Sequence, residues 1–268
     1  MTDGRTMTDG QAERLVRFQQ PEKTLRYLGE LDESRLAALF GLEQAGYREL
    51  LARFDEQNRR TAAELLADPG FAARVARLPF APGQHVVAVG ESTTADRLSW
   101  FEILRHLLPD GVRFSNLAVS GSTGVQALAQ LPLLGFQRPD WVLCMLGAND
   151  AQRIDGVPLV GAAETRRSLA ALCELTVRRT AARWVWLTPT GVDPERVAAY
   201  PHFRRAGLSW SEEDIDGTAG FLLGRPEPVV DTRAAGRGHL SEDGVHLTPD
   251  GQRAVAVALV DALAERTW

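Results

Sequence analysis

Short apolar runs alternate with helical stretches over the larger part of the chain. Most runs are continuous rather than alternating in polarity, which is typical of strands buried on both faces of a sheet. Their residue ranges are 85–90, 113–119, 141–146, 184–189 and 228–231. Apolar residues at helical spacing occupy 98–108, 124–134, 162–180 and 248–266. This alternation predicts an α/β fold with a five-stranded parallel sheet covered by helices on both faces.

The first part of the chain has a different pattern. Apolar residues recur at helical spacing over residues 43–67, with a polar gap at 58–60. Pro21 suits the first turn of a helix, and Asp32 suits the N-cap of the next one. This part is therefore predicted to be helical.

The segment "PFAPG" at 79–83 ends the helical pattern. We therefore predict a helical N-terminal extension over residues 1–81 and a second domain over residues 82–268. The apolar stripe of residues 36–66 is expected to be core or to pack on the second domain; the alternative is a contact with a second copy in a homodimer or with another partner.

Composition and charge limit the range of functions. The chain has 268 residues, 44% of them hydrophobic, and a formal net charge of −5. Lys and Arg are scattered without a basic block, which counts against a nucleic-acid partner. No apolar run approaches the roughly 20 residues that span a bilayer, and the N-terminus lacks an apolar segment of signal-peptide length. We therefore expect a cytoplasmic protein with no membrane span.

Several kinds of site are not indicated. Cys144 and Cys173 are too few for a disulfide framework, and their positions in a strand and a helix predict buried core residues. No histidine pairs with carboxylates at a spacing typical of zinc sites, so we expect no metal. The sequence has no G-x-S-x-G and no G-x-x-x-x-G-K-S/T, which counts against an α/β-hydrolase elbow and a nucleotide-binding loop.

Small and polar residues follow three of the predicted strands. "GEST" contains Ser92, "SGSTG" contains Gly121, and "GAND" contains Asn149. Just before the last helix, "SEDGVHLT" contains Asp243 and His246. The carboxyl ends of parallel strands meet at one edge of a sheet, where open sheets bind their ligands. These residues together supply the groups needed for acyl transfer through a serine.

Each of these residues has a chemical role in such a reaction. A serine hydroxyl becomes a good nucleophile when a base takes its proton, and His246 is the candidate base for Ser92. Asp243 can accept a hydrogen bond from the other imidazole nitrogen and so select the tautomer. The N–H groups of Ser92 and Gly121 and the amide of Asn149 are candidate donors to the oxyanion of a tetrahedral intermediate.

The order of these blocks resembles the SGNH, or GDSL-type, family of serine hydrolases over about residues 84–268. The resemblance implies a flavodoxin-like three-layer α/β/α sandwich. It also implies an esterase or related enzyme that acts on a small-molecule acyl ester without a cofactor. The family's nucleophile, two further oxyanion donors, orienting acid and base fall, in that order, on Ser92, Gly121, Asn149, Asp243 and His246.

Two acidic residues lie beside these blocks. The family usually has Asp before the nucleophile, whereas this chain has Glu91, which is one methylene longer. We expect Glu91 to hold the turn through backbone hydrogen bonds and to take no part in proton transfer. Asp150 is expected to support the site by capping the helix that follows it.

Other interpretations remain open at this stage. Ser92 alone could be the N-cap of the helix at 97–108. The chain could also be an acyltransferase that uses a sugar or small-molecule acceptor, or an inactive flavodoxin-like binding module. The long connection at 190–226 either lines a pocket with its aromatic residues or uses them only as anchors.

Overall fold

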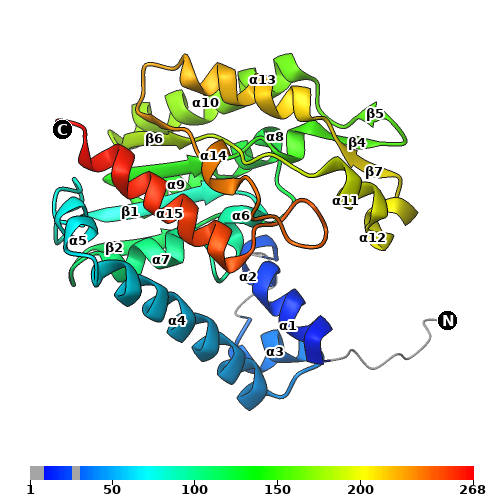
Figure 1. Cartoon of the computed structure of the whole chain (residues 1–268), viewed down its shortest axis with the longest axis horizontal. Helices are drawn as coiled ribbons and strands as arrows, with labels where there is room; N and C mark the ends of the chain where they lie inside the picture. The colour runs from blue at the N-terminus through cyan, green and yellow to red at the C-terminus, as the bar shows by residue number, and fades with distance from the viewer. Residues whose placement is uncertain (1–8, 26–30) are drawn as a thin grey trace.

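The computed structural model describes residues 9–25 and 31–268. Its main sheet has five strands, all parallel, in the order β2-β1-β3-β6-β8 (Figure 1). Their bounds are β1 His85–Gly90, β2 Arg113–Asn116, β3 Trp141–Met145, β6 Arg183–Leu187 and β8 Val229–Val230. The predicted parallel sheet is therefore confirmed. Because β1 lies between β2 and β3, the strand order reverses there, and open sheets bind ligands at the carboxyl ends near such a point.

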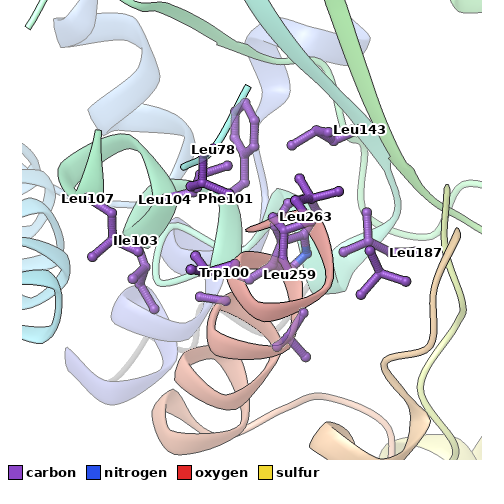
Figure 2. Close-up of a cluster of buried hydrophobic side chains, with 14 of the residues drawn as sticks. Leu78, Trp100, Phe101, Ile103, Leu104, Leu107, Leu143, Leu187, Leu259 and Leu263 are labelled. Atoms are coloured by element: carbon purple, nitrogen blue, oxygen red, sulfur yellow. The ribbon is translucent and has the colours of Figure 1, made fainter. Parts of the chain in front are cut away.

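One helical layer covers the sheet face shown in Figure 2. Its helices are α5 Pro69–Val75, α7 Trp100–Leu107 and α15 Pro249–Ala264. Trp100 of α7 and Leu259 of α15 pack in one buried cluster with Leu143 of β3 and Leu187 of β6. This cluster fixes α15, and with it the loop that precedes α15, against the sheet.

A second helical layer covers the opposite face. Its elements are α8 Gly124–Ala127, the 3₁₀ helix η1 Leu128–Gln130, α9 Leu131–Gln137, α10 Ala162–Thr180 and α13 Glu212–Leu223. Val142 and Cys144 of β3 pack here because successive side chains of a strand point to opposite faces. Cys144 and Cys173 are both buried in this layer, as predicted. The two layers and the sheet form the expected α/β/α sandwich.

The helices before the sheet are α1 Asp9–Phe18, α2 Pro21–Thr24, α3 Glu33–Leu39 and α4 Gln44–Leu66. Tyr47 and Phe54 of α4 pack in one buried cluster with Val16 of α1 and Leu98, which precedes α7. The predicted apolar stripe therefore packs within the chain, and a contact with a second copy or another partner stays a prediction.

Local signals in this region agree with the structure in part. Asp32 is the N-cap of α3, because its side chain accepts a hydrogen bond from Arg35 N at 2.8 Å. The polar gap at 58–60 does not interrupt α4: Asn58 is buried and donates to the carbonyl oxygen of Arg97 at 2.7 Å. The predicted helix that begins at Pro21 includes residues 26–30, and these lie outside the described residues.

A small antiparallel sheet, with the order β5-β4-β7, was not expected from the sequence. Its strands have two or three residues each, too few for a periodic pattern. These strands and the other short elements that follow the strands of the main sheet are α6 Ser92–Ala95, η2 Asn149–Ala151, β4 Gln152–Ile154, β5 Val157–Pro158, α11 Pro194–Ala199, α12 Pro201–Arg205, β7 Leu208–Trp210 and α14 Arg233–Gly236. Pairing of β4 with β7 ties the long connection to the loop that follows β3.

No helix within residues 9–25 and 31–268 is long and apolar enough to cross a membrane. The two longest, α4 and α10, have 23 and 19 residues, and charged residues recur along both.

Candidate active site

A cavity of about 270 Å³ lies at the carboxyl edge of the main sheet. Four of the residues predicted from the sequence line it, namely Ser92, Gly121, Asn149 and His246. They come from the loops after β1, β2 and β3 and from the loop before α15. The fifth, Asp243, contacts His246. The structure therefore brings all five residues together.

The backbone turn after β1 presents Ser92. Ser92 is the first residue of α6 and is 8% exposed, so its side chain is close to the cavity rather than to bulk water. The turn depends on Gly90, because a Cβ there would lie 2.5 Å from Thr94 Oγ1 and 2.9 Å from the carbonyl oxygen of Met145. The alternative that Ser92 caps the following helix is wrong, since Ser99 is the N-cap of α7.

Asp243 and His246 form a hydrogen-bonded pair. His246 Nδ1 lies 2.7 Å from Asp243 Oδ2, and a carboxylate can only accept, so Nδ1 carries the proton. Asp243 Oδ1 accepts from the backbone N–H groups of His246, at 2.9 Å, and Val245, at 3.0 Å. Burial alone would raise the pKa of Asp243, but the hydrogen bonds and charge of His246 hold that pKa well below its usual value. Asp243 therefore stays ionised, and in the neutral form of His246 the acceptor nitrogen is Nε2.

Gly121 and Asn149, the two predicted oxyanion donors from the loops after β2 and β3, both line the cavity. Gly121 has a φ of 80°, a left-handed conformation that favours glycine, and it turns the backbone beside the cavity. Asn149 Nδ2 donates one hydrogen bond to the carbonyl oxygen of Ser122 at 3.2 Å. An amide nitrogen carries two N–H groups, so this bond orients the side chain and leaves a second donor.

Glu91 connects the loops after β1 and β3. Its Oε1 accepts from Ala148 N at 3.1 Å and its Oε2 from Asn149 N at 3.0 Å. The expected backbone hydrogen bonds are present, but their donors belong to the loop after β3 rather than to the turn of Glu91 itself. Burial raises the pKa of Glu91 to about 8; the hydrogen bond from Asn149 opposes the rise, and the charge of Asp150 adds to it.

Replacing Glu91 by glutamine should change the pH dependence of stability. Between about pH 4.5 and about pH 8 the unfolded chain has lost this proton while the native protein keeps it. Wild-type unfolding free energy should therefore fall as the pH rises through this range, by on the order of a few kcal/mol from Glu91. Glu91→Gln should lose this part of the fall in urea unfolding followed by tryptophan fluorescence. Equal slopes against pH for both proteins would contradict this assignment.

Asp150 contacts a different helix from the one predicted. Its Oδ2 accepts from Gly124 N at 2.9 Å, at the start of α8. It therefore satisfies a first-turn N–H of a helix that precedes it in the chain and has Thr123 as its N-cap, whereas the next long helix, α10, has Gly161 at its N-cap. The prediction of the capped helix was wrong because Asp150 reaches across the sheet edge, and sequence spacing shows only local caps.

The contribution of α1 to this cavity was not predicted from the sequence. Arg14, Leu15, Phe18 and Gln19 line it beside His246. The ring centroids of Phe18 and His246 are 4.6 Å apart. No pattern in a ten-residue amphipathic helix distinguishes such contacts from ordinary packing. From the long connection, Phe203 and Trp210 also line the cavity, so aromatic residues of that segment border a pocket, which was one of the two alternatives.

The described part of the chain has no group of three or more His, Cys, Asp or Glu side chains that could hold a metal ion. His85 is buried at the start of β1, with its ring nitrogens 2.9 Å from Gln137 O and from Ser115 Oγ. His85 therefore lies at the amino-terminal end of β1, whereas the cavity lies at the carboxyl ends of the strands.

Comparisons with known proteins agree with this architecture. Solved structures with a similar fold include a lipase/acylhydrolase from Enterococcus faecalis, with a TM-score of 0.54 and 20% identity over 68% of this chain and 95% of that chain. A carbohydrate acetylesterase from Sinorhizobium meliloti has a TM-score of 0.54 and 16% identity over 66% of this chain and 97% of that chain. An aryl esterase from M. smegmatis has a TM-score of 0.53 and 17% identity over 66% of this chain and 97% of that chain.

At these identities the structures show a shared fold. No curated protein sequence matches the chain. The model of the GDSL-like lipase/acylhydrolase family matches residues 86–254, which is more than half of the chain and includes every residue predicted for the site. The chain therefore belongs to the GDSL-like lipase/acylhydrolase family.

Proposed function

We propose that the protein is a serine esterase that hydrolyses a small carboxylic ester through an acyl-enzyme on Ser92. The observation that carries this proposal is the shared cavity of Ser92, Gly121, Asn149 and His246, with an ionised Asp243 bonded to the imidazole. A small cavity supports a short ester rather than a long-chain lipid.

Acylation requires two proton transfers at His246. Ser92 Oγ attacks the ester carbonyl carbon while Nε2 of His246 takes the hydroxyl proton. The tetrahedral intermediate then collapses, the bond from carbon to the alkoxide oxygen breaks, and His246 returns the proton to the leaving alcohol. Asp243 keeps Nδ1 protonated and stabilises the imidazolium that forms in between.

Ser92 and His246 must approach each other for this step. No hydrogen bond joins their side chains in the described residues, although both line the same cavity. Catalytic hydrogen bonds are often long before substrate binds and tighten in the Michaelis complex. Water then repeats the sequence at the acyl-enzyme, with His246 as base and Ser92 as the leaving group.

A fluorophosphonate probe tests this proposal directly, because it forms a stable adduct only with an activated serine. We expect one adduct, located on Ser92 by mass spectrometry of the digested protein, and competition from a short ester substrate. An unlabelled protein, or an adduct on another residue, would count against the proposal.

Asn149→Ala should lower kcat by on the order of 10²–10³ with little change in KM. The amide donates to an oxygen whose negative charge develops only in the transition state, so the loss falls on kcat. Asn149→Asp is the matched variant: it keeps the size but places a carboxylate beside the oxyanion, so its loss should be at least as large. Steady-state kinetics on p-nitrophenyl acetate measure both, and a loss of only a few-fold would remove Asn149 from this role.

A further inference from the structure

The last turn of α1 lies against the imidazole of His246. The Phe18 ring is tilted by 46° to that of His246, with ring centroids 4.6 Å apart. Leu15, one turn earlier on the same helix, lines the same cavity and is 38% exposed. The match to the family model begins at residue 86, so α1 lies outside the matched residues.

Two arginine side chains hold α1 in this position. Arg14 Nη2 lies 2.6 Å from Oδ2 of Asp243, the oxygen that also accepts from His246 Nδ1. Arg17 makes a two-pronged contact with Asp96, a buried carboxylate one residue after α6, at 2.7 and 2.6 Å. Planar, bidentate pairs of this kind fix geometry as well as charge. α1 is therefore tied to the loop that carries Ser92, through Asp96, and to Asp243, which orients His246.

Backbone groups add further attachments. Ser120 Oγ donates to the carbonyl oxygen of Phe18, and Arg97 Nε donates to the carbonyl oxygen of Val16 at 2.9 Å. Just after α1, Lys23 Nζ donates to the carbonyl oxygen of Ala118 at 3.0 Å. Figure 1 shows α1 and α2 below the carboxyl edge of the sheet, close to α6. This wall of the cavity is built in advance of substrate binding.

The chemistry of ester cleavage identifies which part of the substrate meets this wall. His246 must deliver its proton to the leaving alkoxide, so the alcohol half of the ester passes beside the imidazole. The acyl half stays on Ser92 after the alcohol has left. A side chain that packs on the His246 ring, as Phe18 does, therefore borders the alcohol half.

Arg14 does not turn this wall into an anion site. Its guanidinium is engaged by Asp243 at 2.6 Å and by Glu242 at 3.4 Å, so two carboxylates offset its charge. Phe18, which packs on the imidazole, and Leu15, which lines the same cavity, are both apolar. The chemistry of the wall fits an uncharged alcohol.

We propose, on the basis of the esterase function above, that α1 is the alcohol-side wall of the active site. Phe18 and Leu15 limit the size of the uncharged alcohol that the enzyme releases. Phe18 lines the cavity and packs on His246, so a bulky alcohol group that extends past the imidazole meets the Phe18 ring. Arg14 is a positioning residue that acts through α1 and Asp243.

Two ester series separate the alcohol side from the acyl side. The alcohol series is phenyl acetate and naphthyl acetate, which form the same acetyl-enzyme and differ only in acylation. The acyl series is p-nitrophenyl acetate and p-nitrophenyl butanoate, which release the same alcohol. In Phe18→Ala, the ratio of kcat/KM for naphthyl over phenyl acetate should rise about 10-fold or more, since a misfit in an apolar pocket is worth about 10- to 200-fold. The butanoate-to-acetate ratio should stay within about two-fold.

Leu15→Ala should shift the alcohol series in the same direction by a smaller factor, because Leu15 is partly exposed and its removal cannot unfold a core. Phe136→Ala is the matched control: Phe136 is 83% exposed on α9, away from the cavity, and both ratios should be unchanged. A shift in the acyl series equal to that in the alcohol series, an equal loss on all four esters, or no shift would overturn the proposal. A wild-type protein without ester turnover or Ser92-dependent labelling would instead reject the esterase function itself.

Discussion

Ser92→Ala should lower kcat/KM on p-nitrophenyl acetate by on the order of 10⁵–10⁶. Without the hydroxyl no acyl-enzyme can form, and the remaining groups only polarise the carbonyl toward attack by water. The other residues that line the cavity are unchanged in this variant, so KM should change little. The measurement is initial rate against substrate concentration, together with loss of fluorophosphonate labelling.

Ser120→Ala serves as the matched control for this experiment. Ser120 lines the same cavity, but its hydroxyl donates to the carbonyl oxygen of Phe18 and is not paired with a base. Its replacement should leave at least about a tenth of the activity, as expected for the loss of one neutral hydrogen bond. Comparable losses in Ser92→Ala and Ser120→Ala would show that the nucleophile has been wrongly assigned.

Asp243→Asn should lower kcat by on the order of 10³–10⁴. Asp243 Oδ2 accepts a hydrogen bond from the Nδ1–H of His246, and Oδ1 accepts from backbone N–H groups, so the ring is fixed in one tautomer. An amide in this place carries no charge to stabilise the imidazolium, and its NH₂ group favours the wrong tautomer. The loss should appear in both acylation and deacylation, which pre-steady-state kinetics can separate.

Glu242→Gln is the neighbouring control. Glu242 is also an acidic partner of Arg14, at 3.4 Å, but its side chain is 76% exposed and it makes no contact with His246. An exposed ion pair contributes about 0–1 kcal/mol, so activity should stay within about two-fold. If Asp243→Asn behaved like Glu242→Gln, with less than about a ten-fold loss, the orienting role of Asp243 would be rejected.

The sheet could be predicted because it leaves a strong local signal. The run at 141–146 is apolar at every position, since β3 is covered on both faces and no residue of it meets water. Strand ends are less well defined: the run predicted at 113–119 forms a strand only over Arg113–Asn116. The short strands β4 and β7 form because Trp210 and its neighbours reach another loop, which no local pattern records.

The five-residue site could be predicted for a topological reason. Each block follows a strand or precedes the last helix, and parallel strands place their carboxyl ends at one edge. Gly121 and Asn149 therefore needed no knowledge of long-range contacts. The direction in which a side chain reaches was a different matter, and the helix capped by Asp150 was wrongly predicted for that reason.

The contribution of α1 could not be predicted. Arg14 and Asp243 are separated by 229 positions in the sequence, and an arginine on an amphipathic helix usually faces solvent. Phe18 ends a short apolar stripe, and such a stripe predicts only the buried face of a helix. Only the docking of α1 across the sheet edge places Arg14 beside the carboxylate of Asp243 and Phe18 beside the imidazole of His246.

The sequence by itself determined the α/β class, the parallel sheet and the five residues of the candidate site, because periodicity and strand-end position are local properties of the chain. The tertiary structure alone decided what surrounds those residues. Burial that raises the pKa of Glu91, the carboxylate that Arg14 shares with His246, and the wall made by Phe18 all depend on segments that meet only after folding. The free energy of such contacts depends on the distance between the groups and on the exclusion of solvent, and the order of residues along the chain specifies neither without the folded structure.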